Sequence, residues 1–157
     1  MKKAYKGSFM ILFIVTMVLV SPESLAQTKH YIGEKWGGGI VFVVVDDGLH
    51  GLIAETKDQG DCAWKETTNL IIKKANHSME GKAFDDWRLP EKGELFLLYH
   101  QRKIVGGFTG NGYWSVSVED EEVTVLSKDA WNINFSDGDK DLNSRTLELH
   151  VRAVRDF

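Results

Sequence analysis

The chain has 157 residues, 43% of them hydrophobic, and its 19 basic and 23 acidic side chains give a net charge of −4 at pH 7. This length predicts one domain with an ordinary core, and the acidic balance excludes a protein that binds nucleic acid through a broadly basic surface. Cys62 is the one cysteine, so no intramolecular disulfide can form. We expect it to be a buried, unreactive thiol rather than a reactive thiol or an intermolecular disulfide.

Residues 1–26 have the pattern of a secretory signal peptide. Lysines precede an apolar run over residues 9–20, and Ser24-Leu25-Ala26 offers a small-residue cleavage site. The run is shorter than the roughly 20 residues that span a bilayer, so we prefer this interpretation to an uncleaved membrane anchor. Gln27 rather than a cysteine follows the cleavage site, which argues against a lipid anchor. We therefore expect export to the periplasm, the cell surface or the medium.

Removal of this segment makes the chain more acidic. Without Lys2, Lys3, Lys6 and Glu23, the 19 basic and 23 acidic side chains fall to 16 and 22, a net charge of −6. This charge disfavours binding to phosphate backbones or sulfated polymers, which requires clustered lysine and arginine. We expect a short leader over residues 27–36 and a single domain over residues 37–157.

A β-hairpin is predicted to open the domain. Residues 40–45 are an uninterrupted apolar, β-branched run typical of a strand buried on both faces, and residues 50–54 form the returning strand. Asp46-Asp47-Gly48 supplies the turn between them. A metal site formed by Asp46, Asp47 and His50 is the alternative, but the turn explains the same residues with fewer assumptions.

Two helices are predicted in the middle of the chain. The first covers residues 67–76 and the second covers residues 91–103, which follow Pro90 and end before Gly106-Gly107. Both assignments depend on apolar side chains that recur at helical spacing. Over residues 63–75 these are Trp64, Thr68, Ile71, Ile72 and Ala75, and in the second helix they are Leu95, Leu98 and Tyr99.

Strands are predicted to complete the fold. They cover residues 113–118, 130–135 and 146–154, with an acidic loop at 119–122 and an edge strand at 123–126. The predicted fold class is therefore α+β, with two helices packed on mostly antiparallel strands and with the N- and C-terminal strands adjacent.

The block from Asp85 to Leu95 resembles a known family. Its Asp-Asp-Trp-Arg-Leu-Pro run, followed by Glu94-Leu95, is similar to a motif of the Lcl C-terminal domain family, which is named for a bacterial collagen-like adhesin and placed in the C-type lectin-like superfamily. Further blocks occur in the family's order and cover nearly all of the chain after residue 30. They are Gly37-Gly38-Gly39-Ile40-Val41-Phe42 with His50-Gly51-Leu52-Ile53-Ala54, Gly106-Gly107-Phe108, Tyr113-Trp114-Ser115, Ala130-Trp131 with Phe135-Ser136-Asp137-Gly138, and Val151-Arg152-Ala153-Val154-Arg155.

The resemblance implies a C-type lectin-like fold and a recognition role. The adhesin that names the family trimerises and binds sulfated glycosaminoglycans, whereas this chain is acidic and has no collagen repeat. The superfamily's cysteine-dependent oxidases need paired sulfurs, and its calcium-dependent lectins use a Trp-Asn-Asp motif. Here there is one thiol, and Ile133 replaces the aspartate after Trp131-Asn132, so neither activity carries over. The sequence leaves open whether the protein is a homo-oligomer.

A shallow surface of aromatic and amide side chains is the candidate ligand site. Asn132 and Asn134 alternate with apolar residues along their strand, which predicts an exposed amide face. Together with Tyr113 and Trp114, this face would bind a glycan or a peptide. In the alternative interpretation the tryptophans are core residues, because large aromatic side chains usually supply burial. The tryptophans concerned are Trp87, Trp114 and Trp131.

A calcium loop is the candidate metal site. Asp137, Asp139 and Asp141 occupy alternate positions, as the oxygen ligands of a calcium loop do. The distal glutamate of an EF-hand is absent, and the resemblance implies a glycine turn at this place. We therefore expect no cofactor.

Arg88 is expected to have a structural role. Its guanidinium, next to Trp87, is predicted to bridge to Asp86 or Glu94 and so to hold the start of the second helix against the sheet. The other residues assigned to this structural motif are Pro90, Trp131, Arg152 and Arg155.

The sequence contains no recognisable catalytic constellation. The five histidines show no H-E-x-x-H spacing, and no serine lies in a G-x-S-x-G elbow. We expect an exported, adhesin-like recognition module rather than an enzyme, which binds a glycan or a protein through the loops between residues 108 and 143. The alternatives are a structural or assembly subunit that contacts only protein, and a hydrolase whose carboxylates the sequence does not reveal.

Overall fold

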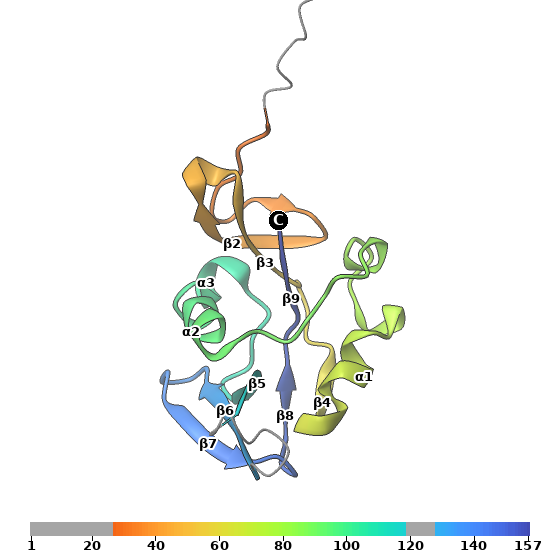
Figure 1. The fold of residues 1–157 in the computed structure, drawn as a ribbon, viewed down its shortest axis with the longest axis vertical. Helices are drawn as coiled ribbons and strands as arrows, with labels where there is room; N and C mark the ends of the chain where they lie inside the picture. The colour runs from red at the N-terminus through yellow and green to blue at the C-terminus, as the bar shows by residue number, and fades with distance from the viewer. Residues whose placement is uncertain (1–26, 119–127) are drawn as a thin grey trace, which may run out of the picture.

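The computed structural model describes residues 27–118 and 128–157. The predicted signal peptide, and the loop and edge strand predicted over residues 119–126, lie outside the described residues. Within those ranges the chain forms two β-sheets and a few short helices, which confirms the α+β class (Figure 1). None of the helices in the described ranges has the length and apolar character needed to cross a membrane.

The first sheet contains strands from both ends of the domain, but the prediction that the N- and C-terminal strands are adjacent is wrong, because two strands lie between them. Its strands are β1 Lys35–Trp36, β2 Gly39–Val45, β3 His50–Ala54 and β9 Val154–Asp156. They are ordered β1-β2-β3-β9, and every pair is antiparallel. The predicted hairpin is confirmed, and its turn places Asp46 and Asp47 at positive φ angles of 49° and 56°. Because β9 pairs with β3, the C-terminus lies on this sheet (Figure 1).

The second sheet lies at the opposite end of the molecule (Figure 1). Its strands are β4 Gly60–Ala63, β5 Gly112–Val118, β6 Asp129–Asn134, β7 Lys140–Ser144 and β8 Glu148–Val151. They are ordered β4-β8-β5-β6-β7. The pair β5 and β8 is parallel and the other pairs are antiparallel, so the expectation of mostly antiparallel strands is confirmed.

The prediction of one strand over residues 146–154 is wrong, because the structure divides this segment between the two sheets. The break falls at Arg152-Ala153, between β8 and β9. The side chain of Arg152 is fully buried and donates hydrogen bonds to the backbone oxygens of Glu55 and Gly107, at 3.0 and 2.6 Å. The backbone therefore leaves one sheet at this point and enters the other.

Three short α-helices accompany the sheets, α1 Thr67–Ile71, α2 Lys92–His100 and α3 Arg102–Val105. The first predicted helix ends at Ile71 rather than at residue 76, and Ile72, which was assigned to the buried face, is exposed. The second predicted helix is interrupted at Gln101, and Gly106, with φ of 74°, follows its last turn as expected.

Hydrophobic packing covers both faces of the second sheet. Tyr113 and Trp114 are consecutive in β5 and point to opposite faces, so Tyr113 packs with α2 residues and Trp114 packs in the cluster beside α1. Figure 1 shows α1 on one side of the sheet and α2 with α3 on the other. The core assignment of Trp87 and Trp114 is thus confirmed, whereas Trp131 is half-buried, with the Lys92 ammonium 3.2 Å from the centroid of its ring.

Candidate ligand-binding groove

The surface proposed from the sequence is not formed. Tyr113, Trp114 and Asn132 are buried, because β5 and β6 lie inside the second sheet and both of its faces are covered. The amide of Asn132, predicted to be exposed, instead donates to the backbone oxygen of Asp141 at 3.0 Å. Asn134 accepts hydrogen bonds from the backbone N–H and hydroxyl of Ser136, so it shapes a turn. The prediction that these side chains share an exposed face is therefore wrong.

Tyr113 stabilises the neighbouring loops. Its hydroxyl donates to Asp58 at 2.9 Å and accepts the backbone N–H of Thr109 at 2.9 Å. Burial raises the pKa of the Tyr113 hydroxyl to about 12, so it stays protonated at neutral pH. The indole N–H of Trp114 donates to the backbone oxygen of Cys62 at 3.0 Å.

The candidate calcium loop, which we did not expect to bind metal, does not gather its carboxylates. Asp137, Asp139 and Asp141 are exposed, and Asp137 accepts the backbone N–H of Asp139 at 3.0 Å, as in an ordinary turn. Across residues 27–118 and 128–157, no group of three or more histidine, cysteine, aspartate or glutamate side chains is placed to hold a metal ion. This result also covers Asp46, Asp47 and His50.

The structural role predicted for Arg88 is confirmed, with Glu94 as its partner rather than Asp86. The guanidinium donates to both carboxylate oxygens of Glu94, at 2.6 and 2.7 Å, and also to Asp156 at 3.1 Å. The alternative partner Asp86 is instead bound by Arg155 at 2.7 and 2.8 Å, and these hydrogen bonds lower the pKa of Asp86. Arg88 therefore links the start of α2 to the last strand.

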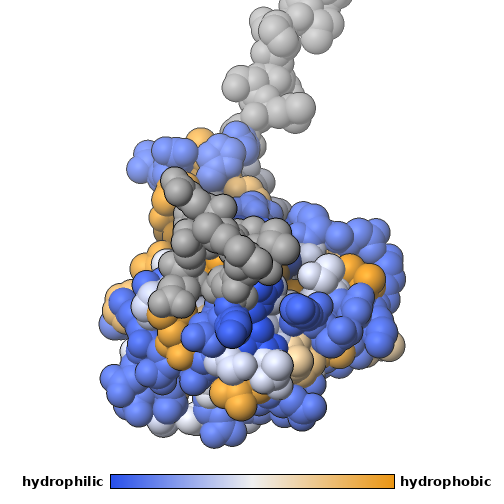
Figure 2. Space-filling model, turned by 60° about the horizontal axis from the view of Figure 1, so that its bottom comes forward, coloured by the Kyte–Doolittle hydropathy of each residue, from blue (hydrophilic) through white to orange (hydrophobic). Residues whose placement is uncertain are grey.

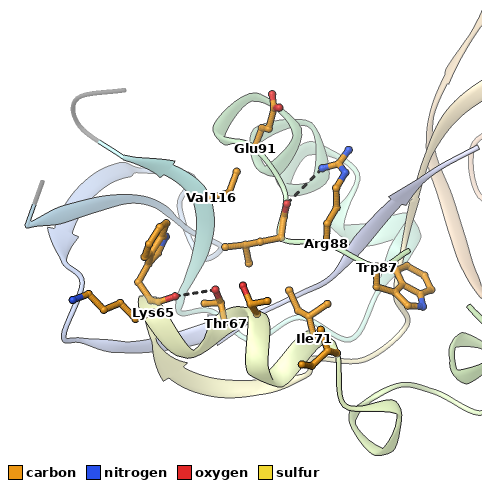
Figure 3. A pocket seen from close by; sticks show the side chains of 11 residues that line it. Lys65, Thr67, Ile71, Trp87, Arg88, Glu91 and Val116 are labelled. Carbon is orange, nitrogen blue, oxygen red and sulfur yellow. Dashed lines mark hydrogen bonds between the residues drawn. The ribbon is translucent and has the colours of Figure 1, made fainter. Parts of the chain in front are cut away.

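The segment of residues 87–91 forms one wall of a groove. A hollow of about 450 Å³ lies between this segment, α1 and β5 (Figure 3). A second hollow of about 220 Å³ adjoins it and shares Ile71, Ile72 and Trp87 with it. The first hollow is lined by apolar and polar residues in nearly equal number. The apolar ones are Trp64, Ile71, Ile72, Trp87, Leu89 and Val116, and the polar ones are Lys65, Thr67, Thr68, Arg88 and Glu91. We call the two hollows together the α1 groove.

Two aliphatic side chains of the α1 groove face the solvent. Ile72 is 68% exposed and Val116 is 46% exposed, although both residues are fully apolar. On the face shown in Figure 2, hydrophobic residues are scattered among hydrophilic ones rather than gathered in one patch. An apolar groove with exposed aliphatic side chains is typical of a site that a ligand covers.

A buried hydrogen-bond network holds the floor of the α1 groove. The indole N–H of Trp87 donates to the backbone oxygen of Gly81 at 2.9 Å, and the ring of Trp87 stacks on His77. His77 donates from Nε2 to the backbone oxygen of Ile71 at 2.6 Å, since a carbonyl can only accept, and its Nδ1 lies 3.0 Å from the Glu55 carboxylate. The end of α1 is thus fixed to the protein core, and the groove is preformed.

The charged side chains of the α1 groove differ in whether they are paired. Lys74 pairs with Asp85 at 2.8 Å, and Arg88 pairs with Glu94. Lys65 and Glu91 also line the groove, and the Glu91 side chain accepts the backbone N–H of Glu94 in the capping box that starts α2. In Figure 3 Lys65 extends from the side of α1, whereas Glu91 lies on the opposite side, at the start of α2.

The α1 groove was not predicted from the sequence. The assumed continuation of the first helix to residue 76 placed Ile72 on the buried face, while the helix ends before it. The available signal was Val116, an aliphatic residue between Ser115 and Ser117 in a strand whose other apolar residues are buried.

Comparison with protein-family models gives a match to a described family. The model of the Lcl C-terminal domain matches residues 43–155, a range that includes every residue lining the α1 groove. No curated protein matches the chain.

Proposed function

Since the chain belongs to the Lcl C-terminal domain family, we propose that it is an exported, non-catalytic, adhesin-like module that binds a glycan or a protein at the cell envelope or outside the cell. We further propose that its fold is C-type lectin-like. The first sheet, which unites the two ends of the domain, and the arrangement of short helices beside a second sheet support this assignment.

The α1 groove carries the proposal. It combines exposed Ile72 and Val116 with a floor whose Trp87 is held by hydrogen bonding and stacking. A preformed apolar site loses little conformational entropy when a ligand binds, and covering its aliphatic side chains removes apolar surface from water. These properties support binding at α1, and we propose this site in preference to the loops between residues 108 and 143.

A glycan array and light scattering test the proposed function. The full chain, recovered from an expressing bacterium, is applied to an array of glycans and of envelope and matrix proteins, once with calcium and once with a chelator. We expect binding that survives the chelator, because the described residues offer no cluster of metal ligands.

A matched pair of variants locates the binding site. Ile72→Glu places a charge in the α1 groove, whereas Ile104→Glu changes an aliphatic residue of similar exposure, 50%, outside the groove lining. We expect the first variant to lose binding and the second to retain it. A blank array together with an oligomer by light scattering would contradict the recognition role and favour the assembly subunit.

A further inference from the structure

We infer that pH regulates the α1 groove through one proton, which is held by the buried pair of His77 and Glu55. With this proton, His77 binds both the end of α1 and the Glu55 carboxylate; without it, the pair repels and α1 is released. As regulation of ligand binding, the inference depends on the proposed recognition function and concerns the same groove. It follows from the hydrogen-bond partners of His77, its burial and its place in the groove.

Both ring nitrogens of His77 face hydrogen-bond acceptors. Nε2 lies 2.6 Å from the backbone oxygen of Ile71, and Nδ1 lies 3.0 Å from a carboxylate oxygen of Glu55. A neutral imidazole has one N–H donor and one lone pair, so it satisfies only one of two acceptors. The pair therefore needs one further proton, either on the ring or on the carboxyl group.

The other donors to Glu55 favour the ring as the place of this proton. The carboxylate accepts the backbone N–H of Thr56 at 2.7 Å, the hydroxyl of Thr56 at 3.2 Å and the backbone N–H of Ser78 at 3.1 Å. Hydrogen bonds to an ionised carboxyl group favour that form. The geometry is thus that of an imidazolium bound to a carboxylate, with both side chains buried.

His150 provides a contrast, because it lies beside a carboxylate without needing a second ring proton. Its Nδ1 binds Asp61, while its Nε2 lies 3.3 Å from the amide nitrogen of Asn111, which is a donor. A neutral ring with its proton on Nδ1 satisfies both partners. Asp61 is also 55% exposed, so water reaches this pair. The need for a proton is therefore particular to His77, whose two partners are both acceptors.

The other charged groups on the elements around His77 are mostly paired with one another. The ion pairs are Lys74 with Asp85 at 2.8 Å, Lys35 with Glu80 at 2.9 Å and Arg155 with Asp86 at 2.7 Å. Each pair contains a side chain that is more than half exposed, so water screens it. Lys73 and Lys82 are the further cations on these elements. Within the described ranges, Glu55 is the charged group that is hydrogen-bonded to the His77 ring.

Loss of the proton separates His77 from Glu55. Nδ1 then presents a lone pair to the carboxylate, and two buried acceptors in contact are costly. When the ring turns away, the Ile71 carbonyl loses its donor and Trp87 loses the imidazole on which it stacks. Ile71, His77 and Trp87 line the smaller hollow, so the groove is complete only while the proton is bound. Ligand affinity should therefore fall as pH rises.

Nuclear magnetic resonance of the full chain tests the inference without a ligand. Long-range ¹H–¹⁵N spectra report the protonation of each His77 ring nitrogen. The protection factor of the Ile72 amide, which donates to the backbone oxygen of Thr68 at 3.0 Å, reports the order of α1. A protection factor compares the amide with an unstructured peptide at the same pH, so the intrinsic pH dependence of exchange cancels.

Both quantities are followed from about pH 5.5 to about pH 9.5, which covers the ordinary titration range of histidine. This range stays below the pKa values of Cys62 and Tyr113, which burial raises to about 11 and about 12. We expect a doubly protonated His77 ring at the lower end. As the ring loses its proton, the Ile72 protection factor should decline by up to about tenfold per pH unit.

Two variants and a control assign the effect to the buried pair. His77→Gln has an amide donor for the Ile71 carbonyl but no titrating ring, and Glu55→Gln offers an amide N–H to a neutral ring. Both should remove the pH dependence of the Ile72 protection factor, whereas His150→Gln, which changes the exposed pair, should retain it. If a variant does not fold, the coincidence of ring titration and lost protection in the unchanged chain remains decisive.

Three results would overturn the inference. They are a His77 ring with one N–H throughout, a ring that loses its proton while the Ile72 protection factor stays constant, and a pH dependence that survives in folded Glu55→Gln. These measurements need no ligand, so their failure leaves the recognition function standing. A blank glycan and protein array overturns the recognition function and leaves the proton of His77 measurable as a property of the fold.

Discussion

Arg152 is the residue whose removal should cost the most stability. Its fully buried guanidinium donates to Asp58 at 2.7 Å and to three backbone oxygens, those of Glu55, Gly106 and Gly107. Arg152→Met keeps much of the volume but leaves a carboxylate and these oxygens without their donor. Breaking a buried pair in this way costs about 3–5 kcal/mol. Urea unfolding followed by tryptophan fluorescence measures the loss.

Arg88→Met is the matched control for this prediction. Arg88 also binds two carboxylates, those of Glu94 and Asp156, but its side chain is 35% exposed. Water can therefore form some of the hydrogen bonds that these carboxylates lose when the guanidinium is removed. We expect a loss of about 1 kcal/mol. A larger loss for Arg88→Met than for Arg152→Met would contradict the importance of burial.

The Cys62 thiol should react slowly in the folded protein. Burial, with the charges of Glu66, Asp61 and Glu148, raises the pKa of Cys62 to about 11, and only the thiolate is nucleophilic. At pH 8 a disulfide reagent should therefore react roughly 100-fold more slowly with the folded chain than with the chain in urea. Equal rates would show that the thiol is reactive, the alternative that the sequence analysis rejected.

The same shift predicts how stability depends on pH. The folded pKa of Cys62, about 11, is higher than that of an unfolded thiol, so the folded state retains this proton where the unfolded state releases it. The contribution of Cys62 to the free energy of unfolding is therefore present below about pH 8.5 and is lost as pH rises through 11. Tyr113, with a pKa raised to about 12, acts in the same direction. Urea midpoints at increasing pH measure the decline.

Residue pairs close in sequence were predictable, and pairs set by tertiary contacts were not. Arg88 and Glu94 lie on either side of Pro90, so their bridge follows from local geometry. The burial of Asn132 depends on a backbone oxygen of Asp141, which reaches it only because β6 and β7 pair. Periodicity alone therefore assigned Asn132 to the wrong environment.

At the scale of elements, side-chain hydrogen bonds to backbone carbonyls decide where α1 ends. Apolar spacing predicted a helix to residue 76, but the Ile71 carbonyl accepts from His77, and the helix stops there. The strand predicted over residues 146–154 is divided for a similar reason, since Arg152 turns into the core and binds loop carbonyls. The order of strands and helices was readable from the sequence. The division of the last strand depends on partners far along the chain, and the end of α1 depends on a histidine side chain six residues further on, which apolar spacing does not reveal.

His77→Leu tests the control of α1 and of the groove floor. The substitution removes the donor to Ile71 and leaves the fully buried Glu55 carboxylate without one partner. We expect a loss of about 1–3 kcal/mol, because buried acceptors lose a donor while the Glu55 carboxylate keeps the backbone N–H donors of Thr56 and Ser78. The change should also alter the fluorescence of Trp87, which stacks on His77. The double variant Glu55→Gln with His77→Leu should recover part of the stability. If it does not, the loss in His77→Leu does not arise at the Glu55 carboxylate.

At the scale of the whole molecule, the two sheets should unfold as one cooperative unit. The chain passes directly from β8 in the second sheet to β9 in the first, and Arg152 between them binds loops that border both sheets. Neither sheet can lose its C-terminal strand without releasing this buried side chain. We therefore expect circular dichroism and tryptophan fluorescence to give coincident urea transitions.

Removal of the C-terminal residues 154–157 should destabilise both sheets. These residues contain β9, and Arg88 forms a backbone bridge with Val154, with both N–H to oxygen distances at 2.9 Å. Loss of β9 would expose the edge of β3, free the Arg88 bridge and leave Arg152 close to a chain end. The shortened chain should lose the native tryptophan fluorescence, to which Trp114 of the second sheet contributes. It should also lose the circular dichroism signal of the first sheet. If the tryptophan fluorescence of the shortened chain, which includes that of Trp114, still shows a cooperative urea transition, the second sheet folds independently.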